Sequence, residues 1–163
     1  MIKKFVPSEI CLACQGCCRF KNIDSTWSVA LLDSDIKRLL RHNIPPALIT
    51  RDKRVALEPA KGEEYFFCSF LRRDNNSCRV YSFRSWECRL YPFLVQKKDN
   101  KTFLAVDLNC PYARSRFRTI DFNKYTLYLR LLLNSPRYLK TLKSNPHVFQ
   151  EYAGTELISE INI

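Results

Sequence analysis

The chain has 163 residues, of which 46% are hydrophobic, and its 27 lysines and arginines against 16 acidic residues give a formal net charge of +11. This size and hydrophobic content predict one folded core with room for an extension, and the presence of only 3 glycines argues against a long flexible linker. No run of about 18 uninterrupted apolar residues occurs, and residues 1–9 lack the apolar segment of a secretory signal. The sequence therefore predicts a cytoplasmic protein with reduced thiols and no membrane association.

The first third of the chain combines a cysteine-rich segment with short helices. Residues 8–20 are expected to form a metal-binding loop. Asp33 or Ser34 can cap a helix that follows. Pro45-Pro46 predicts the start of a second short helix, and residues 53–58 are expected to form a strand.

The middle of the chain is rich in aromatic and β-prone residues. Residues 65–71 and 78–83 are expected to form two short strands, separated by the turn-forming residues 74–77. A helical turn is expected over residues 82–89, and a hairpin around residues 98–101.

After Cys110-Pro111 the pattern changes to helices. Asp121 can cap a helix that continues through Leu133. Ser135-Pro136 and Asn145-Pro146 each place a capping residue before a proline, which is typical of a helix start.

These elements together predict an α+β fold. We expect a small cysteine-rich, metal-centred core with short strands over residues 1–112. Residues 113–163 are expected to form a C-terminal helical extension packed on that core.

Clustered cysteines are the feature most informative about function. Four of them lie within eight residues and four more follow, and all are candidate metal ligands: Cys11, Cys14, Cys17, Cys18, Cys68, Cys78, Cys88 and Cys110. The first three follow the C-x2-C-x2-C spacing of ferredoxin-type clusters, which take a further ligand from a remote cysteine before proline, as in Cys110-Pro111. The C-x2-C spacing is equally half of a zinc site. The sequence therefore predicts an iron–sulfur cluster, of the [4Fe–4S] type, or zinc, and it identifies no catalytic residue.

The number of metal centres stays open. Adjacent side chains in an extended backbone point apart, so Cys17 and Cys18 are better suited to two neighbouring centres or one binuclear site than to one ion. Some of the later four cysteines could instead be ordinary buried thiols, because free cysteine packs well as a small hydrophobe. Disulfides are disfavoured by the expected compartment and by the modest cysteine density.

The residues around the cysteines form a recognisable pattern. It consists of the cluster at residues 11–18, the segment Cys68-Ser69-Phe70-Leu71 and the run at residues 78–93, which contains Cys88-Arg89-Leu90-Tyr91-Pro92-Phe93. This pattern, over roughly residues 11–111, resembles the CxxCxxCC family of YkgJ-like proteins, described as a zinc- or iron-chelating domain and similar to the cysteine-rich part of flagellin lysine N-methylases. The resemblance implies metal or iron–sulfur binding and, less directly, methyl transfer. Where the family usually has Arg-Pro, this chain has Arg84-Ser85, which removes no ligand.

Charged and aromatic residues accompany the later cysteines. Arg84 and Arg89 flank Cys88 and would offset the negative charge of thiolates, while Glu87 is either a ligand, a base or an exposed carboxylate. Aromatic residues in the same region would either shield a metal centre or form an ordinary core: Tyr65, Phe66, Phe67, Tyr81, Trp86, Tyr91 and Phe93.

Three functions remain as alternatives. The first is a metal-binding protein with redox or modification chemistry at the centre. The second is a protein lysine N-methylase-like enzyme acting on a protein substrate. The third is a zinc-stapled binding module whose basic extension binds RNA, another nucleic acid or an acidic protein partner.

Overall fold

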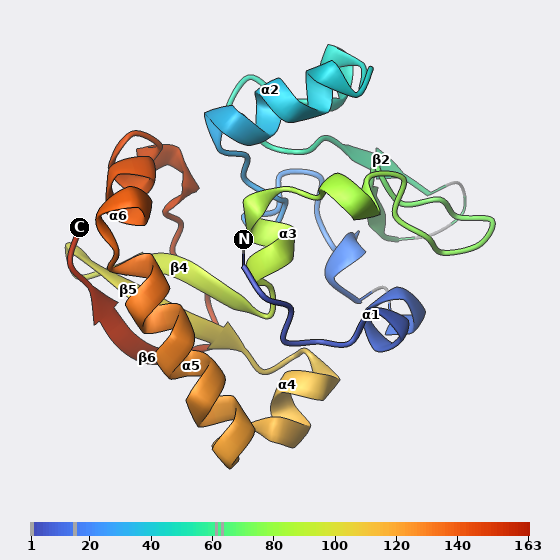
Figure 1. Cartoon of the computed structure of the whole chain (residues 1–163). Coiled ribbons are helices and arrows are strands. Elements are labelled where there is room, and N and C mark those ends of the chain that lie inside the picture. The colour runs from blue at the N-terminus through green and yellow to red at the C-terminus, as the bar shows by residue number, and fades with distance from the viewer. Residues whose placement is uncertain (1, 15, 61, 63) are drawn as a thin grey trace. The chain divides into compact units, whose positions relative to one another are not determined.

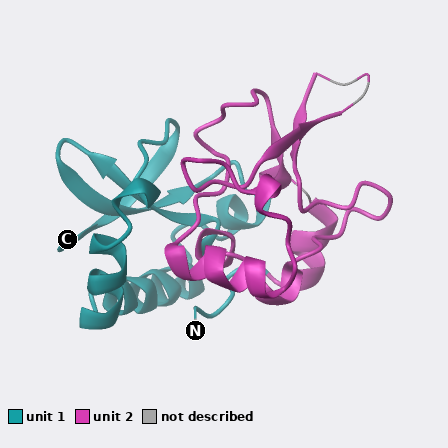
Figure 2. Ribbon diagram, turned by 90° about the horizontal axis from the view of Figure 1, so that it is seen from above, with its two compact units in different colours: residues 1–6, 90–163 teal, residues 7–89 magenta. Residues whose placement is uncertain are grey.

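The computed structural model describes residues 2–14, 16–60, 62 and 64–163 (Figure 1). These residues divide into two compact units (Figure 2). The cysteine-rich unit comprises residues 7–89, and the C-terminal unit comprises residues 1–6 and 90–163. Helices and two small antiparallel sheets make the fold α+β, as the sequence predicts.

The cysteine-rich unit is built from short elements around a three-stranded sheet. Its elements are α1 (Ser8–Cys14), η1 (Gly16–Cys18), β1 (Arg19–Phe20), α2 (Asp33–Arg41), η2 (Pro46–Leu48), β2 (Leu57–Pro59), β3 (Phe66–Cys68), η3 (Tyr81–Phe83) and α3 (Trp86–Leu90), whose last residue begins the other unit. The sheet order is β1-β3-β2, and both pairs are antiparallel. Buried apolar side chains from this sheet, α2 and the connecting loops form the core of the unit: Phe20, Val29, Leu31, Leu39, Val55, Cys68, Phe70 and Val80.

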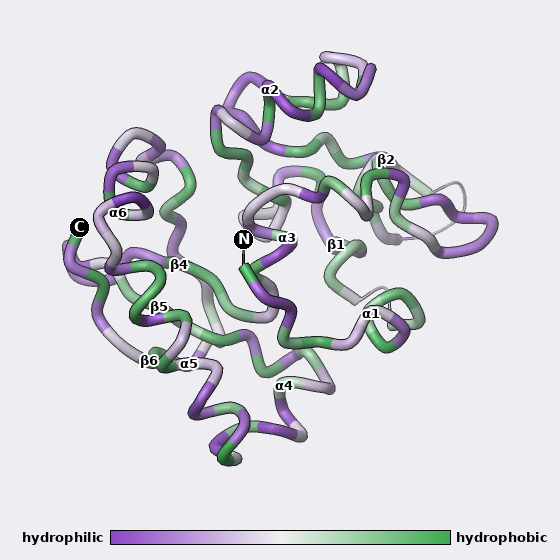
Figure 3. The backbone as a smooth tube through the Cα atoms, in the orientation of Figure 1, coloured by the Kyte–Doolittle hydropathy of each residue, from purple (hydrophilic) through white to green (hydrophobic). Residues whose placement is uncertain are grey.

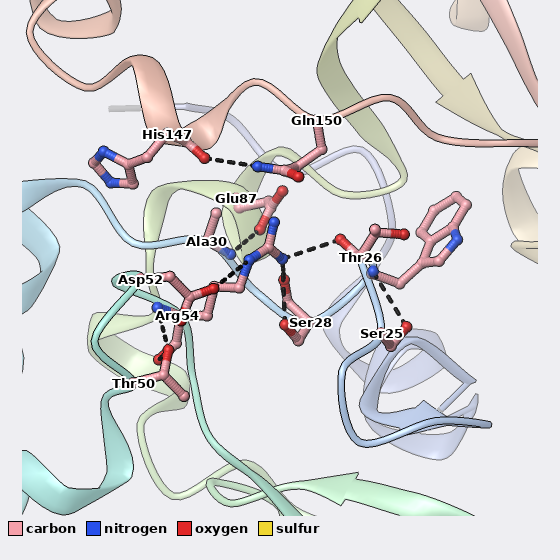
Figure 4. Close-up of polar contacts among 11 residues, drawn as sticks. Ser25, Thr26, Ser28, Ala30, Thr50, Asp52, Arg54, Glu87, His147 and Gln150 are labelled. Carbon is pink, nitrogen blue, oxygen red and sulfur yellow. Dashed lines mark hydrogen bonds and ion pairs between the residues drawn. The ribbon is translucent and has the colours of Figure 1, made fainter.

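An arginine at the centre of a polar network holds the loops of this unit together (Figure 4). Arg54 donates hydrogen bonds from Nη1 to the carbonyl oxygens of Thr26 at 3.0 Å and Ser28 at 2.5 Å, and its Nε lies 3.2 Å from a carboxylate oxygen of Asp52. Nearby, the backbone N–H of Ala30 donates to a carboxylate oxygen of Glu87 at 2.5 Å. Glu87 therefore has a structural role, since it ties α3 to the loop before α2.

The C-terminal unit is a second three-stranded sheet with helices. Its elements are β4 (Phe93–Lys98), β5 (Lys101–Asp107), α4 (Pro111–Arg116), α5 (Ile120–Leu133), α6 (Pro136–Lys143), η4 (Pro146–Val148) and β6 (Thr155–Ile161). The strand order is β4-β5-β6, with both pairs antiparallel, and α5 contacts β6 and α6 (Figure 1). Asp99 and Asn100, with φ of 49° and 62°, form the two-residue turn that a tight hairpin requires.

An aromatic cluster joins α5 to β4 in this unit. The Phe93 ring centroid lies 5.4 Å from that of Phe122 and 5.3 Å from that of Tyr125. Along β4 the chain changes from hydrophobic to hydrophilic, and its first four residues are buried while Lys97 and Lys98 are exposed (Figure 3). The buried end of β4 therefore packs against α5.

Most of the predicted elements are confirmed. The helix that begins at Asp33, the hairpin around residues 98–101, the helix ending at Leu133 and the helix beginning at Pro136 all form. Ser135 and Asn145 occupy the predicted cap positions before Pro136 and Pro146, whereas the caps of α2 and α5 differ from the prediction. Leu32 precedes α2 with an extended backbone, and its N–H donates to Asp35 Oδ2 at 3.3 Å. The Thr119 hydroxyl, in turn, accepts from the backbone N–H of Phe122 at the start of α5.

Three segments differ from the sequence prediction. Residues 8–20 form α1 and η1 over most of their length, where a loop is expected. The strand expected at residues 53–58 begins only at Leu57. Residues 78–83 do not form a strand, because the carbonyl oxygens of Cys78 and Val80 accept hydrogen bonds from residues three positions later, which closes a 3-10 turn.

The C-terminal extension also contains a strand that the helical patterns do not predict. Strand β6 pairs with β5 through most of its length, yet of its residues only Ile161 is buried. Such an edge strand depends on its partner rather than on its own hydrophobic pattern. The division of the chain at residues 112 and 113 stays a prediction. No helix in the described part of the chain is both long and apolar enough to cross a membrane.

Candidate metal centre

Seven of the eight cysteines belong to the cysteine-rich unit. The helical segment α1–η1 carries four of them, β3 ends at Cys68, α3 contains Cys88, and Cys78 lies between these last two. All eight cysteines lie within the described residues, and all are free thiols. Cys110 belongs to the C-terminal unit, where it is buried at the start of α4.

The first two cysteines are held by a short helix. The backbone N–H of Cys11 donates to the carbonyl oxygen of Pro7 at 3.0 Å, which starts α1. Cys11 and Cys14 are then three residues apart on a helix, a spacing that places side chains on the same face. A Cβ atom at Gly16 would lie 3.5 Å from the Cys14 sulfur, an ordinary van der Waals contact, so the chain passes close to this thiol.

Cys17 is the common neighbour of the other thiols in this unit. A hydrogen bond with Cys18, followed by burial and by the charges of Cys18 and Cys14, raises the pKa of Cys17 well above its ordinary value. The charge of Cys17 in turn contributes to the raised pKa values of Cys11, Cys68, Cys78 and Cys88. The C-x2-C-x2-C segment and the three later thiols are therefore close enough in space to interact.

Burial keeps the inner thiols protonated in the metal-free protein. Desolvation, reinforced by the charges of Cys78 and Cys17, raises the pKa of Cys68 to about 12. Burial also raises the pKa of Cys88 well above its ordinary value, against a hydrogen bond from Ser85 that lowers it. A bound cation reverses this preference, because metal ligation requires thiolates and releases their protons.

A buried arginine adds positive charge beside the thiols. The Arg84 residue is 9% exposed, and its Nη1 lies 3.8 Å from the Cys11 sulfur. Its guanidinium carbon lies 4.2 Å from the ring centroid of Tyr81, within the range of a cation–π interaction. The charge of this guanidinium lowers the pKa of Cys11, Cys17 and Cys78 against the larger effects that raise them.

Helix α3 presents Cys88 through two side chains that hold its first turn. Ser85 Oγ accepts a hydrogen bond from the backbone N–H of Cys88 at 3.4 Å. The buried carboxylate of Asp35 accepts from the N–H of Trp86 at 2.9 Å and from the Arg38 guanidinium. Both contacts are absent from the sequence prediction. A sequence signal for the first is a serine three residues before Cys88, the spacing at which an N-cap side chain accepts from a backbone N–H.

The aromatic residues near the thiols divide between core and surface. Phe67 and Trp86 are buried, whereas Tyr65 is 48% exposed and does not shield the thiols. His42, in α2's C-terminal cap, stacks on the Phe83 ring with centroids 4.1 Å apart.

The donor chemistry fits a soft metal, although the described side chains do not form a closed coordination shell. Within residues 2–14, 16–60, 62 and 64–163, no three cysteine, histidine or acidic side chains are arranged to hold a metal ion. The free thiols nevertheless supply soft donors of the kind that zinc and iron–sulfur sites use. The guanidinium of Arg84, whose buried Nε has no hydrogen-bond partner among the described residues, supplies a positive counter-charge. The assignment of all eight cysteines as ligands, Cys110 included, stays a prediction.

Comparison with known proteins identifies a family. The model of the CxxCxxCC family, described as "Putative zinc- or iron-chelating domain", matches residues 10–111. No curated protein and no solved structure matches the chain. The matched segment covers more than half of the chain and contains every one of its cysteines. The chain therefore belongs to the CxxCxxCC family.

Proposed function

We propose that this protein holds a thiolate-ligated metal centre, an iron–sulfur cluster or zinc, through its clustered cysteines. The observation that carries the proposal is the set of seven free thiols in one compact unit, with Cys17 as the shared neighbour of the others. Thiolates are the ligands that both centres prefer.

The number of thiols favours more than one metal ion. A structural zinc ion takes four ligands in a tetrahedron, and this unit alone offers seven thiols. The C-x2-C-x2-C spacing and the remote Cys110-Pro111 favour an iron–sulfur cluster over two zinc ions. We also propose a cytoplasmic location, because thiols stay reduced in that compartment. The lysine methylase and RNA-binding alternatives stay predictions from the sequence.

The test is the metal and sulfide content of the full-length protein purified without oxygen, together with its visible absorption spectrum. Iron and inorganic sulfide in fixed ratio, with a broad visible band, are expected for a cluster. A colourless protein carrying only zinc would select the zinc form. A protein that holds neither metal, even after supply of iron, sulfide and zinc, would contradict the proposal.

Cysteine variants locate the centre. Cys17→Ser should lower the metal content most strongly, because this residue neighbours the other thiols of the unit. Cys110→Ser tests the remote ligand, and unchanged metal content in that variant would restrict the centre to the cysteine-rich unit. Ser82→Ala is the control. Ser82 is exposed and lies between Cys78 and Cys88 in the sequence, so this variant should retain the full metal content.

A further inference from the structure

Arg84 is an unusual residue because its charge is buried without an acidic partner. It is 9% exposed, and no carboxylate among the described residues forms an ion pair with it. Its Nε is a buried donor with no hydrogen-bond partner in the described part of the chain. A buried charge is costly unless it is paired. Arg84 therefore needs a negatively charged neighbour, and among the described side chains only the cysteines can provide one.

The groups around Arg84 are sulfur atoms and one aromatic ring. Nη1 lies 3.8 Å from the Cys11 sulfur, within hydrogen-bond range for sulfur, and the guanidinium carbon lies 4.2 Å from the centroid of the Tyr81 ring. The side chain also interacts electrostatically with Cys17 and Cys78, which lie in two other segments of the unit.

The backbone at Arg84 is held in place as well. Its carbonyl oxygen accepts a hydrogen bond from Arg38 Nη2 at 3.0 Å, and Arg38 also donates from Nε to the carbonyl oxygen of Phe83 at 3.2 Å. Arg38 is itself paired with the buried carboxylate of Asp35. Arg84 is thus held at two points: Arg38 hydrogen-bonds its carbonyl oxygen, and Tyr81 contacts its guanidinium.

We propose that Arg84 is a positioning residue of the metal centre, which supplies the buried counter-charge for its thiolates. Its Nη1 donates to the Cys11 sulfur, and its Nε is the donor for a second sulfur in the metal-bound protein. The inference rests on the proposed function, because only thiolates held by a metal carry the negative charge that this arginine needs. Four thiolates around one zinc ion leave a net charge of −2, which one fixed guanidinium partly offsets.

The experiment measures Co²⁺ and Zn²⁺ affinity of the full-length protein by competition with a chelator, and records the sulfur-to-cobalt charge-transfer band. Arg84→Gln removes the charge and should weaken metal affinity by about 10- to 100-fold, as the loss of outer contacts to ligands typically does. It should also move the band to longer wavelength, because a sulfur that loses a hydrogen bond becomes a better electron donor. Arg84→Lys keeps the charge and should recover most of the affinity, but not the band position.

Arg54→Gln is the matched control. The Arg54 side chain is 11% exposed, and its partners are Asp52 and carbonyl oxygens rather than thiols. This variant should lower stability and leave both the metal affinity and the band unchanged. A purely structural role of Arg84 predicts the same behaviour for Arg84→Gln, so the band position separates the two roles.

The outcomes are distinguishable. If the wild-type protein binds metal and Arg84→Gln binds it with the same affinity and the same band, the role of Arg84 is refuted and the proposed function stands. If the wild-type protein binds neither ion and assembles no iron–sulfur cluster when supplied with iron and sulfide, both are refuted. If it assembles only the cluster, Arg84→Gln is compared with the wild type by the iron content and visible band of that cluster. If Arg84→Gln does not fold, Arg84→Lys decides, since an unchanged band in that folded variant would refute the N–H···S hydrogen bond.

Discussion

Ser85 caps the helix that carries Cys88. Its Oγ accepts a hydrogen bond from the backbone N–H of Cys88 at 3.4 Å, and its carbonyl oxygen accepts from the N–H of Arg89 at 3.2 Å. These are the two contacts of a helix N-cap. The side chain also hydrogen-bonds the Cys88 thiol, which lowers the pKa of that thiol against the effect of burial. Ser85 thus contacts a candidate ligand, Cys88, through both the backbone N–H and the sulfur of that residue.

We predict that Ser85→Ala lowers the free energy of unfolding by about 1 kcal/mol, since this is the typical cost of losing an N-cap side chain. Ser85→Pro should cost less. Arg84, with φ −48° and ψ 152°, already has the extended backbone that precedes proline, and proline reduces the freedom of the unfolded chain. Urea unfolding of the two variants measures the difference. Equal stability of Ser85→Ala and the wild type would contradict the cap.

Local signals in the sequence predict much of the fold. Pro136 after a serine, Asp99-Asn100 between two strands, and the apolar stripe ending at Leu133 each specify an element through neighbouring residues, and the structure has all three elements. Such signals depend on backbone preferences that act within a few residues.

The parts that the sequence does not predict depend on distant partners. Strand β6 forms by pairing with β5 and not through its own pattern. Asp35 is predicted only as part of a helix, yet it is 1% exposed and its partners Trp86 and Arg89 lie more than fifty residues away. In the candidate site, the sequence identifies the thiols and Arg84 by type, whereas the contact of Arg84 with Cys11 across 73 residues appears only in the folded chain.

The thiols should differ in reactivity. The thiolate is the nucleophile in alkylation, so the exposed Cys14 should react fastest with iodoacetamide in the metal-free protein. Cys68 and Cys88 should react slowly, because burial raises the pKa of Cys68 to about 12 and that of Cys88 well above its ordinary value. Metal loading should protect Cys14, and mass spectrometry of the labelled peptides measures the rates. If Cys14 reacted equally fast with and without metal, it would not be a ligand.

The turn before Cys110 is held by a buried aspartate. Asp107 is 4% exposed, accepts from the backbone N–H of Asn109 at 2.8 Å, and accepts from the Tyr91 hydroxyl at 2.8 Å. A hydrogen bond to a charged group contributes about 1.5–3 kcal/mol. Tyr91→Phe should therefore lower the free energy of unfolding by about that amount.

The control for this variant is Tyr112→Phe. The ring of Tyr112 packs against Phe5 and Arg116, and its hydroxyl has no hydrogen bond in the described part of the chain. Its removal should change stability little. Urea unfolding compares the two variants, and an equal loss in both would show that the Tyr91–Asp107 hydrogen bond adds no stability of its own.

Asp35 should make stability depend on pH in a direction opposite to that of an ordinary ion pair. Burial raises the pKa of Asp35 above 3.8, although the N–H groups of Trp86 and Leu32 and the guanidinium groups of Arg38 and Arg89 oppose the rise. Because the folded pKa exceeds the unfolded one, the folded protein binds this proton more tightly. The stability that protonation contributes is present below the unfolded pKa and is lost as pH rises through the folded pKa.

The measurement is the difference in the free energy of unfolding between the wild type and Asp35→Asn across this acidic range, at the same state of metal loading. Asparagine does not titrate, so the difference isolates the Asp35 contribution from those of the other carboxylates. The wild type should lose stability relative to the variant as pH rises from 3.8 through the folded pKa, and the difference should then stay constant. A relative gain over the same range would mean that Arg38 and Arg89 outweigh burial, and that the cluster around Asp35 acts as a stabilising ion pair that holds α2 to the helix carrying Cys88.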